Sequence, residues 1–233
     1  MLLLSVGCSF TLGAELRDCV GGKPSNLSWA ALLSKKMNMD YRCCALPGAS
    51  NQTISRIVID AVSKDNPNFV AIMWTFINRY EYYRNGKMQL VNLPMSKDDK
   101  EVYGFYKVFG LDDNQMLYSS IMSFLLVQEY LSNRKIPFIF TMADVNPFKK
   151  CLIVDGKMQP DRLLIDQDPV LKSLYNELDQ SKWFWIDPNH TNDGFFDWAH
   201  RNYPVGPNKH PLEEAHARLA DSIYPMALTL TSK

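Results

Sequence analysis

The stretch that decides the fold is LLLSVGCSFT, residues 2–11. Its apolar run over residues 2–7, which ends at Gly7, predicts a short β-strand, and Gly7 permits a tight exit from that strand. Ser9 follows at once. The run is short, no basic segment precedes it and polar residues come directly after it, so it does not predict a signal peptide. We therefore expect a cytoplasmic protein whose first strand delivers a serine to one edge of a sheet.

The same kind of segment recurs along the chain. Apolar runs predict four further strands, over residues 41–46, 69–74, 137–142 and 183–186. Helical spacing of apolar residues predicts helices between and after them: over 28–37, after a cap at Ser50 or Asn51, from Ser119 or Ser120, from Asp168–Pro169, and from Pro211. Alternating strands and helices predict a three-layer α/β/α sandwich around a mainly parallel five-stranded sheet.

Length and charge narrow the class of protein. The 233 residues fit a single domain, 1–233, with an insertion at about 79–118 on the rim of the sheet. The 25 basic and 25 acidic residues cancel, so no overall field attracts nucleic acid or an anionic membrane, and we expect neither partner. The five cysteines show no zinc-type spacing, so we expect no metal and reduced thiols.

Two residues lie where chemistry is expected. Ligands of parallel sheets bind beyond the carboxyl ends of the strands, and Ser9 follows such an end. His210 precedes Pro211, which favours an extended backbone at His210 and suits a general base at a helix start. Each also has an ordinary explanation, a strand-to-loop turn for Ser9 and an exposed loop for His210. For His216 we expect a packing or helix-surface role.

Together these two motifs resemble the SGNH/GDSL hydrolase family. That family carries its nucleophile in an N-terminal Gly-x-Ser-x-Thr-like block and its base in a C-terminal Asp-x-x-His-Pro block. LPGASN, residues 46–51, stands where the family places an oxyanion-hole glycine, which matches Gly48. WTFIN, residues 74–78, stands where the family has a Gly-x-Asn-Asp block. The resemblance spans almost the whole chain in order.

The sequence departs from the family pattern in two places. The third block lacks its glycine and aspartate, and its asparagine, Asn78, falls about one residue late, so Asn51 is a rival oxyanion donor. Pro207 occupies the usual place of the triad aspartate. A literal Asp-x-x-His occurs at Asp197–His200 but lacks the following proline, so His200 ranks behind His210. We expect Asp197, or a backbone carbonyl, to orient His210.

The resemblance implies a serine esterase that needs no cofactor. His210 would activate Ser9 for attack on an ester carbonyl, and the N–H groups of Ser9 and Gly48 with one asparagine amide would bind the oxyanion. The substrate would be a small-molecule or glycan ester, such as an O-acetylated glycan.

The insertion is the expected specificity element. We expect Thr75, Arg79 and Tyr82 to contact substrate, although packing is the more common role for most aromatic rings of this region and Arg79 could equally pair with Glu81.

Two other functions stay open. One is an O-acyltransferase on the same scaffold, with a sugar hydroxyl in place of water. The other is a catalytically silent binding module, which the altered third block and the missing aspartate favour.

Overall fold

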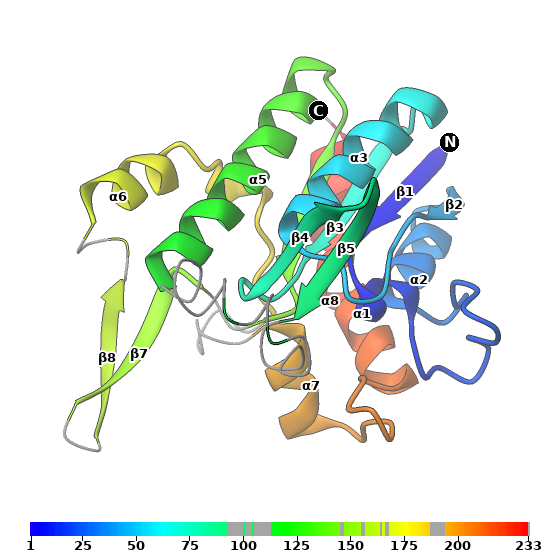
Figure 1. Ribbon diagram of the computed structural model, residues 1–233. Coiled ribbons are helices and arrows are strands. Elements are labelled where there is room, and N and C mark those ends of the chain that lie inside the picture. Colours follow the sequence, from blue (N-terminus) through cyan, green and yellow to red (C-terminus); the bar gives the residue numbers. More distant parts are fainter. Residues whose placement is uncertain are drawn as a thin grey trace.

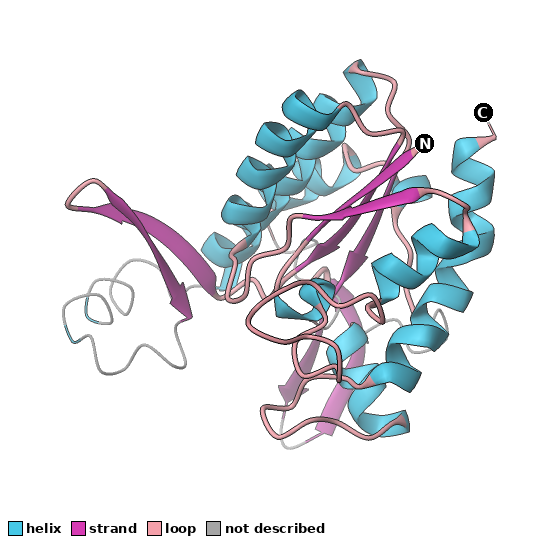
Figure 2. Cartoon of the chain, turned by 90° about the vertical axis from the view of Figure 1, so that its right-hand side faces the viewer, coloured by secondary structure: helices cyan, strands magenta, loops and turns pink. Residues whose placement is uncertain are grey.

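The computed structural model describes residues 1–92, 100, 104, 113–144, 147–154, 157–163, 165, 168–186 and 194–232. Its central sheet holds four parallel strands in the order β2-β1-β3-β6. Their bounds are β1 Leu2–Val6, β2 Asp40–Cys43, β3 Phe69–Trp74 and β6 Phe138–Met142. Helices cover both faces of this sheet (Figures 1 and 2), so the predicted α/β/α sandwich is confirmed. Every residue of β3 is buried, as a strand covered on both faces requires.

The helices form two layers. On one side α2 (Trp29–Lys36) packs against α8 (Glu213–Thr231), and on the other α3 (Asn51–Asp65) packs against α5 (Asp113–Asn133). The shorter helices are α1 (Ser9–Leu12), α6 (Pro169–Asn176) and α7 (Phe195–Asn202). Within the described part of the chain, no helix is both long and apolar enough to cross a bilayer.

Two predicted helix caps are confirmed by hydrogen bonds from the side chain to the first turn. The Ser50 hydroxyl accepts a hydrogen bond from the Thr53 N–H, and Asp168 caps α6 ahead of Pro169. Two predicted starts are wrong. Helix α5 begins before Ser119, and α8 begins after Pro211 because Pro211 pairs with Val205 in an isolated β-bridge.

The predicted fifth strand, residues 183–186, is reduced to one parallel bridge. Trp183 pairs with Phe140, and the Phe184 N–H donates to the Phe140 carbonyl at 2.7 Å. A 3-10 turn, η3 (Gln180–Lys182), precedes it. The apolar run marks aromatic packing instead of a ladder, because the rings of Trp183 and Trp185 stack 5.4 Å apart.

Two hairpins lie outside the central sheet. β4 (Arg79–Arg84) and β5 (Lys87–Asn92) are antiparallel and joined at Asn85–Gly86, both of positive φ, where the sequence predicts a turn. They occupy the start of the predicted insertion; residues 93–99, 101–103 and 105–112 of it lie outside the described part. The second hairpin, β7 (Lys149–Val154) with β8 (Lys157–Leu163), was not predicted and extends away from the sheet (Figure 1).

Candidate active site

Ser9 lies just beyond the carboxyl end of β1, as the first residue of α1. A tight approach to β3 makes this possible, because a Cβ on Gly7 would lie 2.9 Å from the Met73 carbonyl oxygen and 2.2 Å from Thr11 Oγ1. As the first residue of a helix, Ser9 has an N–H with no intrahelical acceptor. Its side chain is 8% exposed. The strand end therefore delivers both a hydroxyl and a free backbone donor to the same edge of the sheet.

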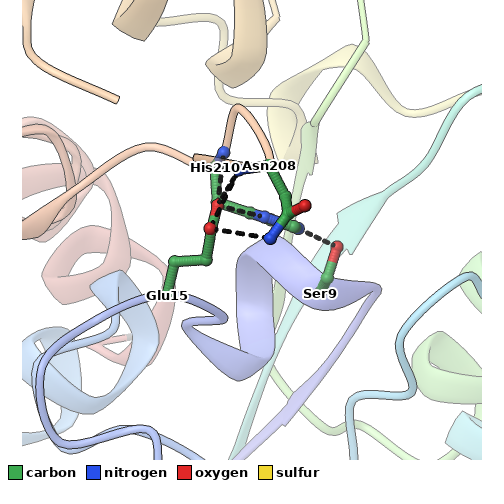
Figure 3. A network of polar contacts seen from close by, with 4 residues as sticks. All are labelled: Ser9, Glu15, Asn208 and His210. Carbon is green, nitrogen blue, oxygen red and sulfur yellow. Dashed lines mark hydrogen bonds and ion pairs between the residues drawn. The ribbon is translucent and has the colours of Figure 1, made fainter. Parts of the chain in front are cut away.

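His210 reaches Ser9 from the other end of the chain, 201 positions away (Figure 3). Its Nε2 lies 2.9 Å from Ser9 Oγ, and its Nδ1 lies 2.8 Å from Glu15 Oε2. A carboxylate can only accept, so Nδ1 carries the proton and Nε2 is free to accept the serine hydroxyl. This is the geometry of an activated nucleophile with its base and the group that orients the base.

The Glu15 carboxylate is held by four donor groups. The Asn208 backbone N–H lies 2.9 Å from Oε1 and 3.1 Å from Oε2, and the Asn208 side-chain amide donates to Oε1 at 2.9 Å. The His210 backbone N–H adds a bond at 3.1 Å and its ring the fourth. Partial burial raises the pKa of Glu15, but these hydrogen bonds outweigh it and lower the pKa from its ordinary 4.5 to about 2. The carboxylate is thus ionised at neutral pH.

Two residues with left-handed backbone conformations flank the contact between Glu15 and His210. Glu15 itself adopts φ +69°, and Lys209 adopts φ +64° in the turn that carries His210. That turn is closed by the Gly206 N–H, which donates to the His210 carbonyl at 2.8 Å. A Cβ on Gly206 would lie 2.7 Å from Glu15 Oε2, so a glycine is needed beside the carboxylate.

Glu15 occupies the place for which the sequence suggested Asp197 or a carbonyl. That expectation is wrong, because the Nδ1 side of His210 is filled by Glu15 while Asp197 lies in the first turn of α7. His200, the lower-ranked base, has its Nδ1 2.8 Å from the Phe196 carbonyl oxygen. No motif marked Glu15, since it follows the serine block instead of preceding the histidine. Its acidic side chain close after Ser9 was the sole available signal.

His216 is a packing residue, as expected. It is fully buried, and its Nδ1 accepts the Trp29 N–H at 3.1 Å. Burial lowers the pKa of His216 from its ordinary 6.5 to about 3, so its ring stays neutral.

The three non-serine oxyanion candidates have different surroundings. Gly48, at φ +75°, sits in a loop fastened to the serine block by the Leu46 N–H, which donates to the Gly7 carbonyl at 3.0 Å. Asn78 has a buried Oδ1 without a described hydrogen-bond partner. The contributions of Gly48, Asn78 and the Ser9 N–H remain predictions.

Asn51 is a structural residue, which corrects its assignment as an oxyanion donor. Its amide nitrogen donates to the Thr75 carbonyl at 3.3 Å and to Ser120 Oγ at 3.0 Å, and its Oδ1 accepts the Thr75 N–H at 2.9 Å. The amide is buried and both of its N–H groups are engaged. It fastens α3 to the end of β3 and to α5.

Of the three residues expected to contact substrate, one packs within the fold and the other two contact each other. Tyr82 packs against the cluster of Val91 and Met116, which matches the packing alternative. Glu81 pairs with Arg56 at 3.1 Å, so the suggested pair with Arg79 is not formed. Thr75 and Arg79 contact each other, Nη1 to Oγ1, at 2.7 Å. Their contact with substrate remains a prediction.

An aromatic wall lies beside His210. The Phe10 ring lies 5.3 Å from the His210 ring, 5.9 Å from Phe196 and 6.2 Å from Phe76. These rings give one side of the histidine an apolar neighbour.

No family model matches the sequence, and no curated protein matches it. Several solved structures, in contrast, have a similar fold. The chain aligns with TesA at a TM-score of 0.53 and 14% identity, covering 99% of each chain. It aligns with a catalytic mutant of Axe2, an acetylxylan esterase from Geobacillus stearothermophilus, at a TM-score of 0.52 and 15% identity. That alignment covers 97% of this chain and 93% of Axe2. A putative lipolytic protein of the G-D-S-L family from Desulfitobacterium hafniense aligns at a TM-score of 0.50 and 13% identity. The alignment covers 97% of this chain and 98% of that protein. The chain therefore has an SGNH-like hydrolase fold.

Proposed function

We propose that this protein is a serine esterase of the SGNH/GDSL type that hydrolyses an ester through an acyl-enzyme on Ser9. The observation that carries the proposal is the continuous Ser9–His210–Glu15 relay, with heavy-atom distances of 2.9 and 2.8 Å. The fold, shared with an acetylxylan esterase, supports ester chemistry.

The geometry leads to a two-stage reaction. His210 Nε2 takes the hydroxyl proton as Ser9 Oγ bonds to the carbonyl carbon, and the carbonyl π-pair moves onto oxygen. Collapse re-forms the carbonyl and breaks the bond to the alcohol, which leaves with the proton from His210. Water then repeats the sequence on the acyl-enzyme and releases the acid. Throughout, ionised Glu15 stabilises the imidazolium that forms twice per turnover.

Oxyanion stabilisation is assigned to backbone donors. The Ser9 N–H at the start of α1 and the Gly48 N–H are the proposed pair, with Asn78 as the third donor. One such donor typically contributes about 3 kcal/mol to lowering the barrier.

The proposed substrate is a small-molecule or glycan acetyl ester. Axe2, with the same fold, is an acetylxylan esterase, which supports an acetyl group. The Glu15 carboxylate supplies the group whose apparent lack favoured a silent binding module, so catalysis is the better-supported function.

Covalent labelling tests the proposal. A fluorophosphonate probe should label the folded protein, and Ser9→Ala should abolish both labelling and hydrolysis of 4-nitrophenyl acetate. Ser63→Ala, an exposed serine on α3, is the matched control and should behave as wild type. A folded wild-type protein that neither reacts with the probe nor hydrolyses the ester would refute the proposal. Labelling with transfer of acetyl to an added glycan, in place of hydrolysis, would assign an acyltransferase.

A further inference from the structure

Arg79 lies at the same edge of the sheet as the nucleophile. β1 and β3 are parallel neighbours with Val6 opposite Ile72, so Ser9 and Thr75 each follow three positions after that pair. Arg79 Nη1 donates to Thr75 Oγ1 at 2.7 Å. This contact places the guanidinium at the rim beside the serine block.

The charge of Arg79 has no counter-ion in the described part of the chain. The nearest candidate in sequence, Glu81, accepts instead from Arg56 at 3.1 Å and from Thr53 Oγ1 at 2.6 Å. Among the described residues, the guanidinium makes its one polar contact with a neutral hydroxyl. Its Nε is buried and has no acceptor among the described residues. A buried donor without an acceptor is unfavourable, so the described residues leave part of the hydrogen-bonding capacity of this guanidinium unused.

The guanidinium lies over one ring of the aromatic wall. Its Cζ lies 4.7 Å from the centroid of the Phe76 ring, within cation–π range. Phe76 contacts Phe10, and Phe10 contacts His210. A row of neighbouring rings therefore links the Arg79 cation to the His210 ring.

We infer that Arg79 is a specificity-determining residue that binds a carboxylate on the substrate. The inference rests on the proposed esterase function and names its substrate class, an acetyl ester whose alcohol part carries a carboxylate, such as an acidic sugar. A planar guanidinium matches a carboxylate with two parallel hydrogen bonds, which a point charge cannot do. Because the chain has zero net charge, such selection depends on this local contact.

Matched esters test the inference. We would compare kcat/KM for 4-acetoxybenzoate, its neutral methyl ester and 4-acetoxybenzenesulfonate, each divided by its rate of alkaline hydrolysis. Wild type should prefer the carboxylate. Arg79→Gln should lower the carboxylate-to-neutral ratio by about tenfold or more, the effect of losing a charge-assisted hydrogen bond. Arg79→Lys should lose the preference for carboxylate over sulfonate. Arg84→Gln, an exposed arginine on the same strand, should leave every ratio unchanged.

A binding measurement separates this inference from the esterase proposal. Benzoate binding by calorimetry to the Ser9→Ala protein needs no turnover and should weaken about tenfold or more when Arg79→Gln is added. Equal benzoate affinity with and without Arg79, or rates that fall equally for charged and neutral esters, would overturn the inference. Equal preference for carboxylate and sulfonate would overturn the carboxylate assignment. A protein without esterase activity but with Arg79-dependent benzoate binding would refute only the catalytic proposal.

Discussion

At the scale of single residues, the candidate site joins Ser9 and His210, whose chain neighbours restrict their backbone, to Glu15, whose place depends on contacts distant in sequence. Ser9 follows a glycine at a strand end and His210 precedes a proline, and both neighbours restrict the backbone in ways that a sequence reveals. Glu15 becomes the partner of His210 only through its left-handed backbone and its bonds to Asn208, which form in three dimensions. Local patterns carry no record of such contacts.

Glu15→Gln should reduce kcat by roughly 10³- to 10⁴-fold while the protein stays folded. A neutral amide can present N–H to Nδ1, which favours the wrong histidine tautomer, and it no longer stabilises the imidazolium. Asp197→Asn is the matched control and should change kcat less than about twofold, which steady-state hydrolysis of 4-nitrophenyl acetate measures. A comparable loss in Asp197→Asn would restore Asp197 as the orienting group.

At the scale of elements, long apolar runs were predictable and hairpins were less so. The run over 69–74 matches β3 residue for residue, because a strand buried on both faces must be apolar throughout. The β7–β8 hairpin was missed although Asp155–Gly156 is a hairpin signal, since Pro160 within the second strand argues against a strand. The run over residues 183–186 predicted a strand wrongly, because large apolar side chains such as Trp183 and Trp185 are favoured both in strands and in aromatic packing.

The turn that carries His210 should tolerate no side chain at Gly206. In Gly206→Ala the new methyl group meets the Glu15 carboxylate at 2.7 Å, so the carboxylate or the turn must shift. A shift of this size at a positioning group typically lowers kcat by about 100-fold. Gly104→Ala is the control, because a Cβ at Gly104 meets no atom within 4 Å. Equal activity of the two variants, measured with 4-nitrophenyl acetate, would show that the turn adapts without cost.

At the scale of the whole molecule, one core joins the two helix layers through the sheet. His216 belongs to that core, on α8, and its contact with the Trp29 N–H ties α8 to the start of α2. The overall sandwich was predictable because alternation of strands and helices leaves few arrangements. The choice between packing and a helix-surface place for His216 was not, since its burial depends on how completely the neighbouring elements cover it.

Buried His216 should make the domain less stable as pH falls. Its folded pKa of about 3 lies below its ordinary 6.5, so the unfolded chain gains a proton that the folded chain refuses. The stabilisation is complete above pH 6.5 and is lost as pH falls toward 3. Between pH 7.5 and 5.5 this one residue should remove about 1 kcal/mol from the free energy of unfolding.

Urea unfolding of wild type and of His216→Gln or His216→Asn at the two pH values measures this effect. The variants should show a smaller pH dependence, whatever their absolute stability. If the free energy of unfolding changed equally with pH in wild type and variants, groups other than His216 would cause the acid sensitivity. Glu15 acts in a separate window, because its stabilising charge is lost only as pH falls from 4.5 toward 2.

Under the proposed function, the separation of Ser9 from His210, 201 positions in sequence, also makes hydrolysis a late reporter of folding. Contacts this distant in sequence close slowly, because a long loop must be ordered before they form. The serine and its carboxylate lie together near one end of the chain, and neither can act until the histidine turn docks. A chain that has folded only its first strands therefore lacks the Ser9–His210 pair, and turnover regained during refolding would mark the docking of the histidine turn.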